Sequence, residues 1–196
     1  MAVGTLPLLV SDDAMLKKAV AGERDSLDEL FRRYRLIAFR VAHRLLGNEA
    51  DALDAVQEGF VKALVHLPSF QGRSSFKTWM LRVVSNAALD LGRQRGRRET
   101  LSMDALGPTY REECEPLIHI DPSRELDRQD LRRKLNEALA LLPAAQRQTF
   151  VLHAEAELSY REVAETLDIS IGTVMSRLYY ARLRLRVLLE PWIKPQ

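Results

Sequence analysis

The chain has 196 residues, a formal net charge of +2 and an apolar fraction of 46%. This length suits one ordinary domain or two small ones, and the composition permits a packed core while excluding a polycation. The one cysteine, Cys114, excludes an internal disulfide and a cysteine-based zinc site. No run approaches the roughly 20 apolar residues that a membrane span requires, and residues 6–10 lack the features of a signal peptide. We therefore expect a soluble, cytoplasmic protein.

The first half of the chain carries helical patterns. After a short tract at 12–20, apolar residues recur at spacings of three and four along 26–46, 49–67 and 75–91. These tracts predict a compact helical bundle. The buried stripe expected for the third tract is Leu53, Val56, Phe60, Leu64 and Leu67.

The composition changes at Gly92. Residues 92–98 carry four arginines and no carboxylate, and residues 101–127 combine prolines and acidic residues without a helical period. This pattern predicts a first domain at 11–96, a flexible acidic linker at 97–123 and a second domain at 124–192. The expected fold class is all-α, with two small helical domains joined by the linker.

The clearest local pattern lies near the C-terminus. Ser159 and Glu162 fit a capping box at the start of a short helix. Asp168 can adopt a left-handed turn, and Ser170 can cap the helix that follows. The apolar side expected for this second helix is Val174, Leu178, Ala181 and Leu185. A short capped helix, a tight turn and a second amphipathic helix predict a helix-turn-helix.

The other side of the second helix carries residues that suit DNA. Small polar side chains near its N-terminus can approach base edges, and Arg177 can bridge to guanine or phosphate. Arg182, Arg184 and Arg186 add attraction to the phosphate backbone. The alternative is two packed helices with a solvated basic face. The candidate DNA-binding residues are Ser170, Thr173, Ser176, Arg177, Tyr180 and Arg184.

A second candidate surface is acidic. Asp51, Asp54 and Glu58 are spaced to share one helix face, with Gln57 beside them. Because carboxylates repel DNA, this face suits a basic or polar protein surface. An ordinary solvated helix face is the alternative. An enzymatic role would require the carboxylates to converge in a pocket with a metal or a second acid, and the sequence offers no such partner set.

The tract at 75–91 and the loop before it mix aromatic and basic residues. Aromatic rings beside cations can stack unpaired bases and hold a phosphate strand. For Phe76 and Trp79 we favour core packing, and a plain polar surface is the alternative for Arg82, Asn86 and Asp90. The residues of this mixture are Phe70, Arg73, Phe76, Lys77, Trp79 and Arg82, followed by Asn86, Asp90 and Arg93.

The order of these motifs resembles the extracytoplasmic-function (ECF) group of sigma-70-type sigma factors along nearly the whole chain. The matching segments are 51–58, 76–90, 142–150, 160–164 and 172–178. The resemblance implies a transcription initiation factor that directs core RNA polymerase to promoters and is not an enzyme. Tyr180 and Asp168 depart from residues that are frequent in the family, which leaves a phosphate contact and the turn geometry open.

The resemblance also assigns roles to the candidate surfaces. Asp51, Asp54, Gln57 and Glu58 match the docking face for the clamp helices of the polymerase β′ subunit. The loop at 68–75 matches the pocket for a flipped base of the −10 element. The helix-turn-helix matches the part of the family that binds the −35 element. Its apolar residues match those that contact the β-subunit flap. The residues implied for −10 binding are Arg73, Lys77, Thr78, Arg82, Asn86, Asp90 and Arg93.

No cofactor or metal is expected, because His43, His66, His119 and His153 lack ligand spacing. The expected partners are core RNA polymerase and promoter DNA, and the resemblance makes an anti-sigma protein a candidate partner. Direct membrane insertion is not expected. The main alternative is a stand-alone helix-turn-helix regulator, which would leave the acidic face and the first domain unexplained. A nuclease and a protein that merely sequesters a partner are the other classes.

Overall fold

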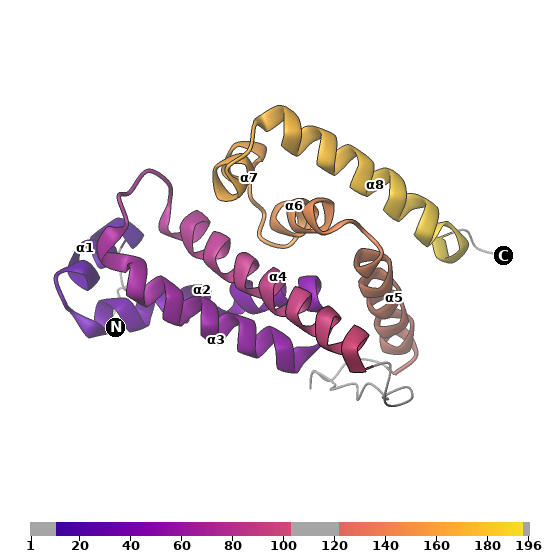
Figure 1. Ribbon diagram of the computed structural model, residues 1–196, viewed down its shortest axis with the longest axis horizontal. Helices are drawn as coiled ribbons and strands as arrows, with labels where there is room; N and C mark the ends of the chain where they lie inside the picture. The colour runs from indigo at the N-terminus through magenta and orange to yellow at the C-terminus, as the bar shows by residue number, and fades with distance from the viewer. Residues whose placement is uncertain (1–10, 103–121, 194–196) are drawn as a thin grey trace, which may run out of the picture.

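The computed structural model describes residues 11–102 and 122–193, with side chains placed for 11–95 and 130–190. Within these ranges the chain forms eight α-helices and one 3-10 turn, without a strand. The all-α expectation is therefore confirmed. Helices α1–α4 form an N-terminal unit and α5–α8 a C-terminal unit (Figure 1). Most of the predicted linker lies outside the described residues.

The N-terminal unit consists of α1 (Asp12–Val20), α2 (Arg24–Leu46), α3 (Glu49–His66), the 3-10 turn η1 (Leu67–Ser69) and α4 (Phe76–Ser102). Local chemistry sets the joint between α2 and α3. Gly47 ends α2 in the left-handed region, at φ 79°, which glycine adopts without steric cost. Asn48 then caps α3, since its side-chain oxygen accepts the Asp51 backbone N–H at 2.9 Å.

Small residues hold α3 close to α4. A Cβ atom at Gly59 would lie 2.8 Å from Val84 Cγ2 and 3.0 Å from Val84 Cα, so only glycine fits this crossing. Ala52, Ala55 and Ala63 are buried on the same side of α3. The crossing gives a physical reason for a glycine in mid-helix, where it otherwise costs roughly 1 kcal/mol.

The expected buried stripe of α3 is wrong in part. Val56 and Phe60 pack against the core and Leu67 is buried, but Leu53 and Leu64 are 53% and 47% exposed. The reason is that alanine and glycine form the close α3–α4 contact, which turns the larger apolar side chains toward solvent. The buried face of α3 is thus rotated from the one that hydropathy predicts.

Helix α4 is longer than the change of composition at Gly92 indicates. It continues through the arginine run to Ser102, so residues 92–98 are helical. The predicted boundary at 96/97 therefore falls inside this helix. In the N-terminal part of α4, Phe76, Met80, Val84 and Ala87 are buried.

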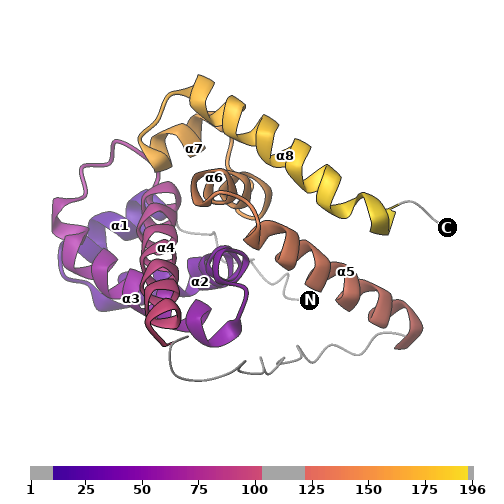
Figure 2. The same ribbon diagram turned by 45° about the vertical axis from the view of Figure 1, so that its right-hand side comes forward.

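The C-terminal unit consists of α5 (Pro122–Ala140), α6 (Ala144–Ala154), α7 (Tyr160–Leu167) and α8 (Ile171–Ile193). Helix α6 lies between the N-terminal unit and α8, as Figures 1 and 2 both show. One small apolar cluster joins α5 to α8. Its buried members are Ala138, Leu139, Leu142, Ala181 and Leu185.

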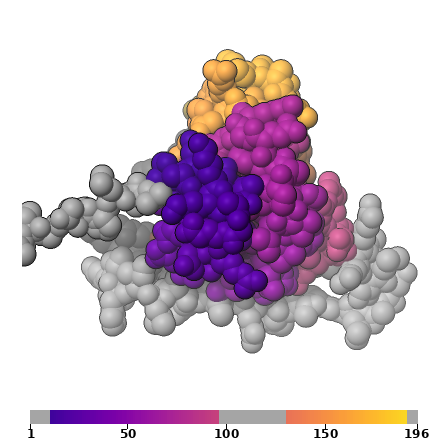
Figure 3. All heavy atoms as spheres, turned by 90° about the vertical axis from the view of Figure 1, so that its left-hand side faces the viewer, coloured from indigo at the N-terminus to yellow at the C-terminus, as the bar shows by residue number. Residues whose placement is uncertain are grey.

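The two units pack against each other. Helix α2 contacts α5 and α6, and α4 contacts α6 and α7. One apolar cluster runs from Leu30 and Val84 of the N-terminal unit to Leu152 and Leu178 of the C-terminal unit. Viewed from the end that α1 covers, the orange and yellow C-terminal unit lies directly against the N-terminal unit (Figure 3). None of the helices within the described ranges is long and apolar enough to cross a membrane.

Candidate nucleic-acid interface

The turn between α7 and α8 is built by three local devices. The Ser159 hydroxyl accepts the Glu162 backbone N–H at 3.2 Å, and the Ser159 backbone N–H donates to the Glu162 carboxylate at 2.8 Å. Asp168 ends α7 in the left-handed region at φ 54°, and Ser170 accepts the Thr173 N–H at 3.0 Å. The predicted capping box, turn and second cap are therefore confirmed.

The capping box also affects the charge of Glu162. Hydrogen bonds from the Ser159 hydroxyl, and then from its backbone N–H, hold the pKa of the Glu162 carboxyl below its usual value. Lys77 of α4 lowers this pKa further, by a smaller Coulombic effect. An ionised Glu162 favours the start of α7 because the first turn of a helix attracts negative charge.

Helix α8 has one buried and one open side. Val174, Leu178, Ala181 and Leu185 are buried, as the sequence predicts. Ser176, Tyr180 and Arg184 are exposed and share the opposite side. Thr173 and Arg177 are half-buried at its edge, and the Ser170 and Thr173 hydroxyls lie 2.8 Å apart within the cap. The structure thus brings the candidate residues of α8 onto one side of the helix.

Sequence reasoning did not single out the apolar residues beside this polar side. Ile171, Met175, Tyr179 and Leu183 follow one another at four-residue intervals and are exposed. The Tyr179 and Tyr180 rings meet edge to face, 5.3 Å apart. The four-residue spacing is visible in the sequence, but both sides of α8 carry apolar residues, so the period does not tell which is buried.

The aromatic residues near α4 are structural. Phe70, Phe76 and Trp79 form one cluster, with ring centroids 5.0 to 6.5 Å apart. Phe76 is buried and Trp79 half-buried, so the preference for core packing is confirmed. Thr78 is 1% exposed, and its hydroxyl lies 2.7 Å from that of Ser75. Thr78 therefore helps to fix the start of α4, and its side chain does not reach the surface.

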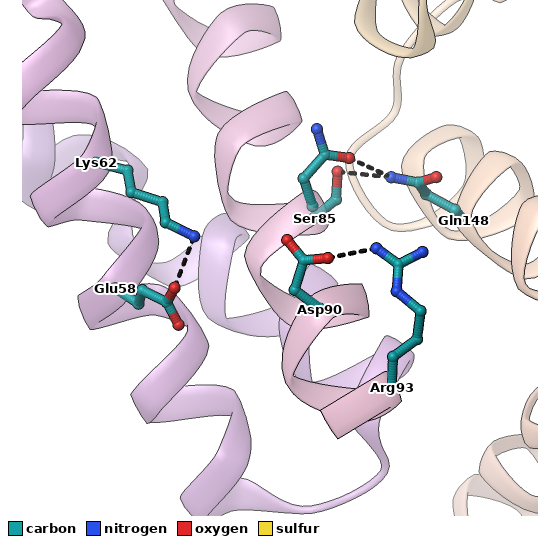
Figure 4. Close-up of polar contacts among 7 residues, drawn as sticks. Glu58, Lys62, Ser85, Asp90, Arg93 and Gln148 are labelled. Atoms are coloured by element: carbon teal, nitrogen blue, oxygen red, sulfur yellow. Dashed lines mark hydrogen bonds and ion pairs between the residues drawn. The ribbon is translucent and has the colours of Figure 1, made fainter. Parts of the chain in front are cut away.

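The other candidate residues of α4 and its preceding loop lie nearer to solvent. Arg73, Arg82, Asn86 and Arg93 are exposed, and Lys77 and Asp90 are half-buried. Asp90 and Arg93 form an ion pair one turn apart (Figure 4). At helical spacing, Arg82, Asn86, Asp90 and Arg93 fall on one side of α4. We call this narrow polar strip, which the core leaves at least partly open, the α4 strip.

The acidic face of α3 differs from the expectation at one residue. Asp51 is only 7% exposed, accepts a 2.7 Å hydrogen bond from the Asn48 amide and pairs with Arg95 of α4. Asp54, Gln57 and Glu58 are exposed together, and Glu58 pairs with Lys62 at 2.6 Å (Figure 4). Asp51 therefore joins α3 to α4, and the other three form the open acidic surface.

Exposed apolar side chains surround this acidic surface. Leu53, Val61, Leu64 and Val65 are each about half exposed or more. Together with Asp54, Gln57 and Glu58 they form a mixed apolar and acidic surface, which we call the α3 surface. Such a surface is typical of protein contacts. Among the residues that the structure describes, no group of three or more His, Cys, Asp or Glu side chains could hold a metal ion.

Comparisons with known proteins agree with this architecture. The Sigma-70 region 2 family model matches residues 30–98, and the Sigma-70 region 4 model matches residues 132–185. The ECF RNA polymerase sigma-E factor of Escherichia coli K12 is 30% identical over 187 residues, covering 94% of this chain and 97% of the relative. The ECF RNA polymerase sigma factor SigE of Mycolicibacterium smegmatis is 37% identical over 161 residues, covering 82% of this chain but 60% of the relative.

Two solved structures are also similar. CnrH, in complex with the cytosolic domain of CnrY, gives a TM-score of 0.70 at 25% identity and covers 92% of this chain and 98% of its own. The Bartonella quintana sigma factor RpoE, in complex with the anti-sigma factor NepR, gives 0.61 at 26% identity, with coverage of 83% and 97%. Both sigma regions are present in order, and the Escherichia coli relative is aligned over almost its full length, so the chain belongs to the ECF group of sigma-70-family RNA polymerase sigma factors.

Proposed function

We propose that this sigma factor divides promoter recognition among three surfaces. The α3 surface binds core RNA polymerase, the α4 strip binds the −10 element, and the polar side of α8 binds the −35 element. The observation that carries the proposal is the form of α8. Its apolar side is fully packed, while its polar side stays open beside a helix N-terminus capped by Ser170.

For the −35 element, two features support α8. The N-terminus of a helix carries partial positive charge and favours a nearby phosphate. Ser176 and Arg177 lie in the first turns, where side chains of a recognition helix reach base edges. Tyr180, Arg184 and the exposed Arg182 and Arg186 follow toward the C-terminus and suit phosphate contacts. Ser170 and Thr173 form the N-terminal cap of α8, and from this position they approach the DNA backbone.

For the −10 element, the residues of the α4 strip supply the contacts with DNA. The loop at 68–75 leads into α4 and sets how this helix begins. Arg82 and Arg93 attract the phosphate strand, while Asn86 can pair with a base edge. Arg73 and Lys77 flank the loop and add positive charge. Thr78 has an indirect role, because its contact with Ser75 fixes how the loop enters α4.

For core polymerase, the α3 surface offers both apolar area and charge. Asp54, Gln57 and Glu58 can pair with a basic partner while Leu53 and Val61 lose contact with water. We assign this surface to the β′ clamp helices and the apolar parts of the C-terminal unit to the β flap. Asp51 is buried next to this surface, where it accepts a hydrogen bond from Asn48 and pairs with Arg95.

Regulation and location follow from the same reasoning. The similar structures CnrH and RpoE were each solved with a protein partner, and for RpoE the partner is an anti-sigma factor. We extend this to the present chain and infer that an anti-sigma protein regulates it. We also infer that it acts in the cytoplasm, where core polymerase and promoter DNA are found.

Run-off transcription tests the proposal directly. Purified chain is mixed with purified core polymerase on a promoter library, and the start sites of the RNA products are mapped. We expect defined products that require the chain and that share −10 and −35 sequences. A stand-alone regulator would bind DNA without core polymerase and would give no such products. That outcome would refute the sigma function.

The α3 surface has its own test. Asp54→Ala combined with Glu58→Ala should weaken binding to core polymerase by about 1 kcal/mol or more, because charged partner groups lose their pairs. Asp25→Ala combined with Asp28→Ala removes the same charge from exposed positions on α2 and serves as the control. Equal affinity of both double variants for core polymerase would contradict the assignment.

A further inference from the structure

Helix α1 is held against α2 by its first residue. The Asp12 carboxylate accepts hydrogen bonds from the Tyr34 hydroxyl and, at 2.5 Å, from Nη1 of Arg33, both on α2. The Asp12 and Arg33 side chains are each 26% exposed, so the contact is largely shielded from solvent. A charge-assisted hydrogen bond in such a place is stronger than one between neutral groups. Asp12 therefore fixes both the start of α1 and the position of the Tyr34 hydroxyl.

The Tyr34 ring extends this contact into the aromatic cluster at the start of α4. Its centroid lies 5.8 Å from that of Phe76, the first residue of α4, which is 2% exposed. The Phe76 ring in turn meets Phe70, in the loop at 68–75, edge to face at 6.5 Å. Figure 1 shows α1 at the same end of the N-terminal unit as this loop. A continuous path of contacts thus leads from Asp12 to the loop.

The Tyr34 hydroxyl is not needed to fill the core, since a phenylalanine ring would occupy the same space. Burial, followed by the hydrogen bond to Asp12, raises the pKa of Tyr34 far above its usual value. The hydroxyl is therefore protonated at neutral pH and donates to Asp12. Because hydrogen bonds are directional, this contact holds the ring at one angle against Phe76.

The loop at 68–75 is fixed near both ends and open between them. The Phe70 backbone N–H donates to the Leu67 carbonyl at 3.0 Å, and the Ser75 hydroxyl caps α4. Between these points Gln71, Gly72 and Arg73 are exposed. Ordering a loop upon binding costs free energy, so a loop that is already held in place binds its ligand more tightly. The Phe70 ring, packed on Phe76, holds the loop in this way.

We infer that Asp12 and Tyr34 are positioning residues for the −10 element. They hold Phe76 and Phe70, so that the loop at 68–75 and the start of α4 keep the shape that −10 binding requires. Neither residue contacts DNA itself. The inference rests on the proposed function of the α4 strip and of this loop, and it gives α1 a part in promoter recognition that none of the three proposed surfaces includes.

Binding of the −10 element to preassembled holoenzyme tests the inference. The probe is a fluorescent single-stranded oligonucleotide with the −10 sequence of a promoter recovered by run-off transcription. Tyr34→Phe removes one hydroxyl and keeps the ring, and Asp12→Ala removes the acceptor. Each should weaken binding of the probe about three- to tenfold, which corresponds to the net contribution of one hydrogen bond. The affinity of both variants for core polymerase and for −35 duplexes should be unchanged, because those surfaces lie on other helices.

Asp13→Ala is the matched control. It removes the same charge from the first turn of α1, but from an exposed position, and it should bind the probe as wild type does. Asp12→Ala combined with Tyr34→Phe should lose no more than Asp12→Ala alone, because both changes break the same hydrogen bond. A further loss in the double variant would mean that Tyr34 acts without Asp12 and would overturn the inference.

Hydrogen exchange in the free chain tests the positioning without DNA. In Tyr34→Phe the Phe70 amide should exchange about three- to tenfold faster than in wild type, because the loop opens locally more often. The Gly47 amide, which donates to the His43 carbonyl at 2.8 Å in the turn between α2 and α3, is the reference and should not change. Equal acceleration at both amides would show a general loss of stability and would refute the positioning role.

The possible results separate this inference from the sigma function. If Tyr34→Phe, Asp12→Ala and Asp13→Ala all bind the probe alike, the positioning role is refuted and the sigma function stands. An equal loss of affinity for the probe and for core polymerase also refutes it, because the contact would then serve only the fold. If the wild-type chain gives no run-off products with core polymerase, the proposed function fails and the inference fails with it.

Discussion

Helices α4 and α8 both carry arginines and small polar groups that we assign to DNA, but they are built into the molecule differently. Helix α8 buries one side and leaves the opposite side open over its first four turns. Helix α4 contacts α2, α3, α6 and α7, so little of it beyond the α4 strip and its C-terminal end remains open. Because α4 lies at the centre of the fold, most of its side chains pack against neighbouring helices, and few of them can contact DNA.

The two helices also differ in their polar contacts. The polar side of α8 is open, whereas Asn86 of the α4 strip, though exposed, accepts a hydrogen bond from Gln148 of α6. The comparison also predicts that substitutions on opposite sides of α8 act on different properties.

Leu178→Ala tests the buried side of α8 and should have the largest effect on stability. Leu178 is buried in the cluster that both units share. Its truncation should lower the free energy of unfolding by about 2–5 kcal/mol, measured by urea denaturation. Ser176→Ala, two residues earlier on the exposed side, should change it by less than about 0.5 kcal/mol. Equal losses would show that α8 has no open side.

Arg177→Ala tests recognition at the edge of the open side. The half-buried Arg177 side chain is positioned by packing, so it suits a base contact rather than a diffuse attraction. Its loss should cost about 1–3 kcal/mol in binding to −35 duplexes and relax specificity at one position, measured by fluorescence anisotropy over a sequence panel. Arg184→Ala should weaken all sequences alike. A uniform loss for Arg177→Ala as well would make it a phosphate contact.

Gly59→Ala tests how tightly the inner side of α4 is held. The added methyl group would overlap Val84, at a cost of about 1–3 kcal/mol for overpacking. The better helix propensity of alanine stabilises the folded chain by about 1 kcal/mol, which offsets part of this cost. We therefore expect the free energy of unfolding to fall by roughly 1 kcal/mol. Gly92→Ala is the matched control, because its Cβ would meet only Leu46 Cδ2 at 3.4 Å. Gly92→Ala should stabilise the chain, and a gain for both would refute the tight crossing.

The sequence predicts the helix-turn-helix well because its determinants are local. Ser159, Asp168 and Ser170 act on backbone or side-chain groups within three or four residues, so their roles can be predicted without knowledge of the fold. For α3 the same logic fails. The α3–α4 contact uses alanine and glycine, which carry little hydropathy, so the period points to Leu53 and Leu64 instead.

The contacts between the two units are harder to predict from the sequence. The Gln148–Asn86 and Arg44–Glu155 pairs are 62 and 111 residues apart along the chain, and no local pattern connects such positions. One signal was present, because Gln148 shares its side of α6 with Val151 and Leu152. A polar residue on an apolar side indicates a buried hydrogen bond, although the partner is evident only from the fold.

The smallest expected effect concerns Glu162, where the helix-turn-helix meets α4. Hydrogen bonds from Ser159 lower the pKa of Glu162 in the folded chain, so the carboxylate stabilises the fold above its unfolded pKa of about 4.5. This contribution is lost as the pH falls through the lower, folded value. Glu162→Gln keeps an acceptor for the Ser159 backbone but cannot ionise. Wild type should therefore be more stable than Glu162→Gln at neutral pH, and the difference between their urea midpoints should disappear below about pH 4.5.

The same pKa tests the contact between α7 and α4. Because Lys77 of α4 also lowers the pKa of Glu162, Lys77→Ala should raise that pKa slightly in the folded chain. A Glu162 pKa, followed by NMR, that is unchanged by Lys77→Ala would mean that α7 and α4 do not meet in solution.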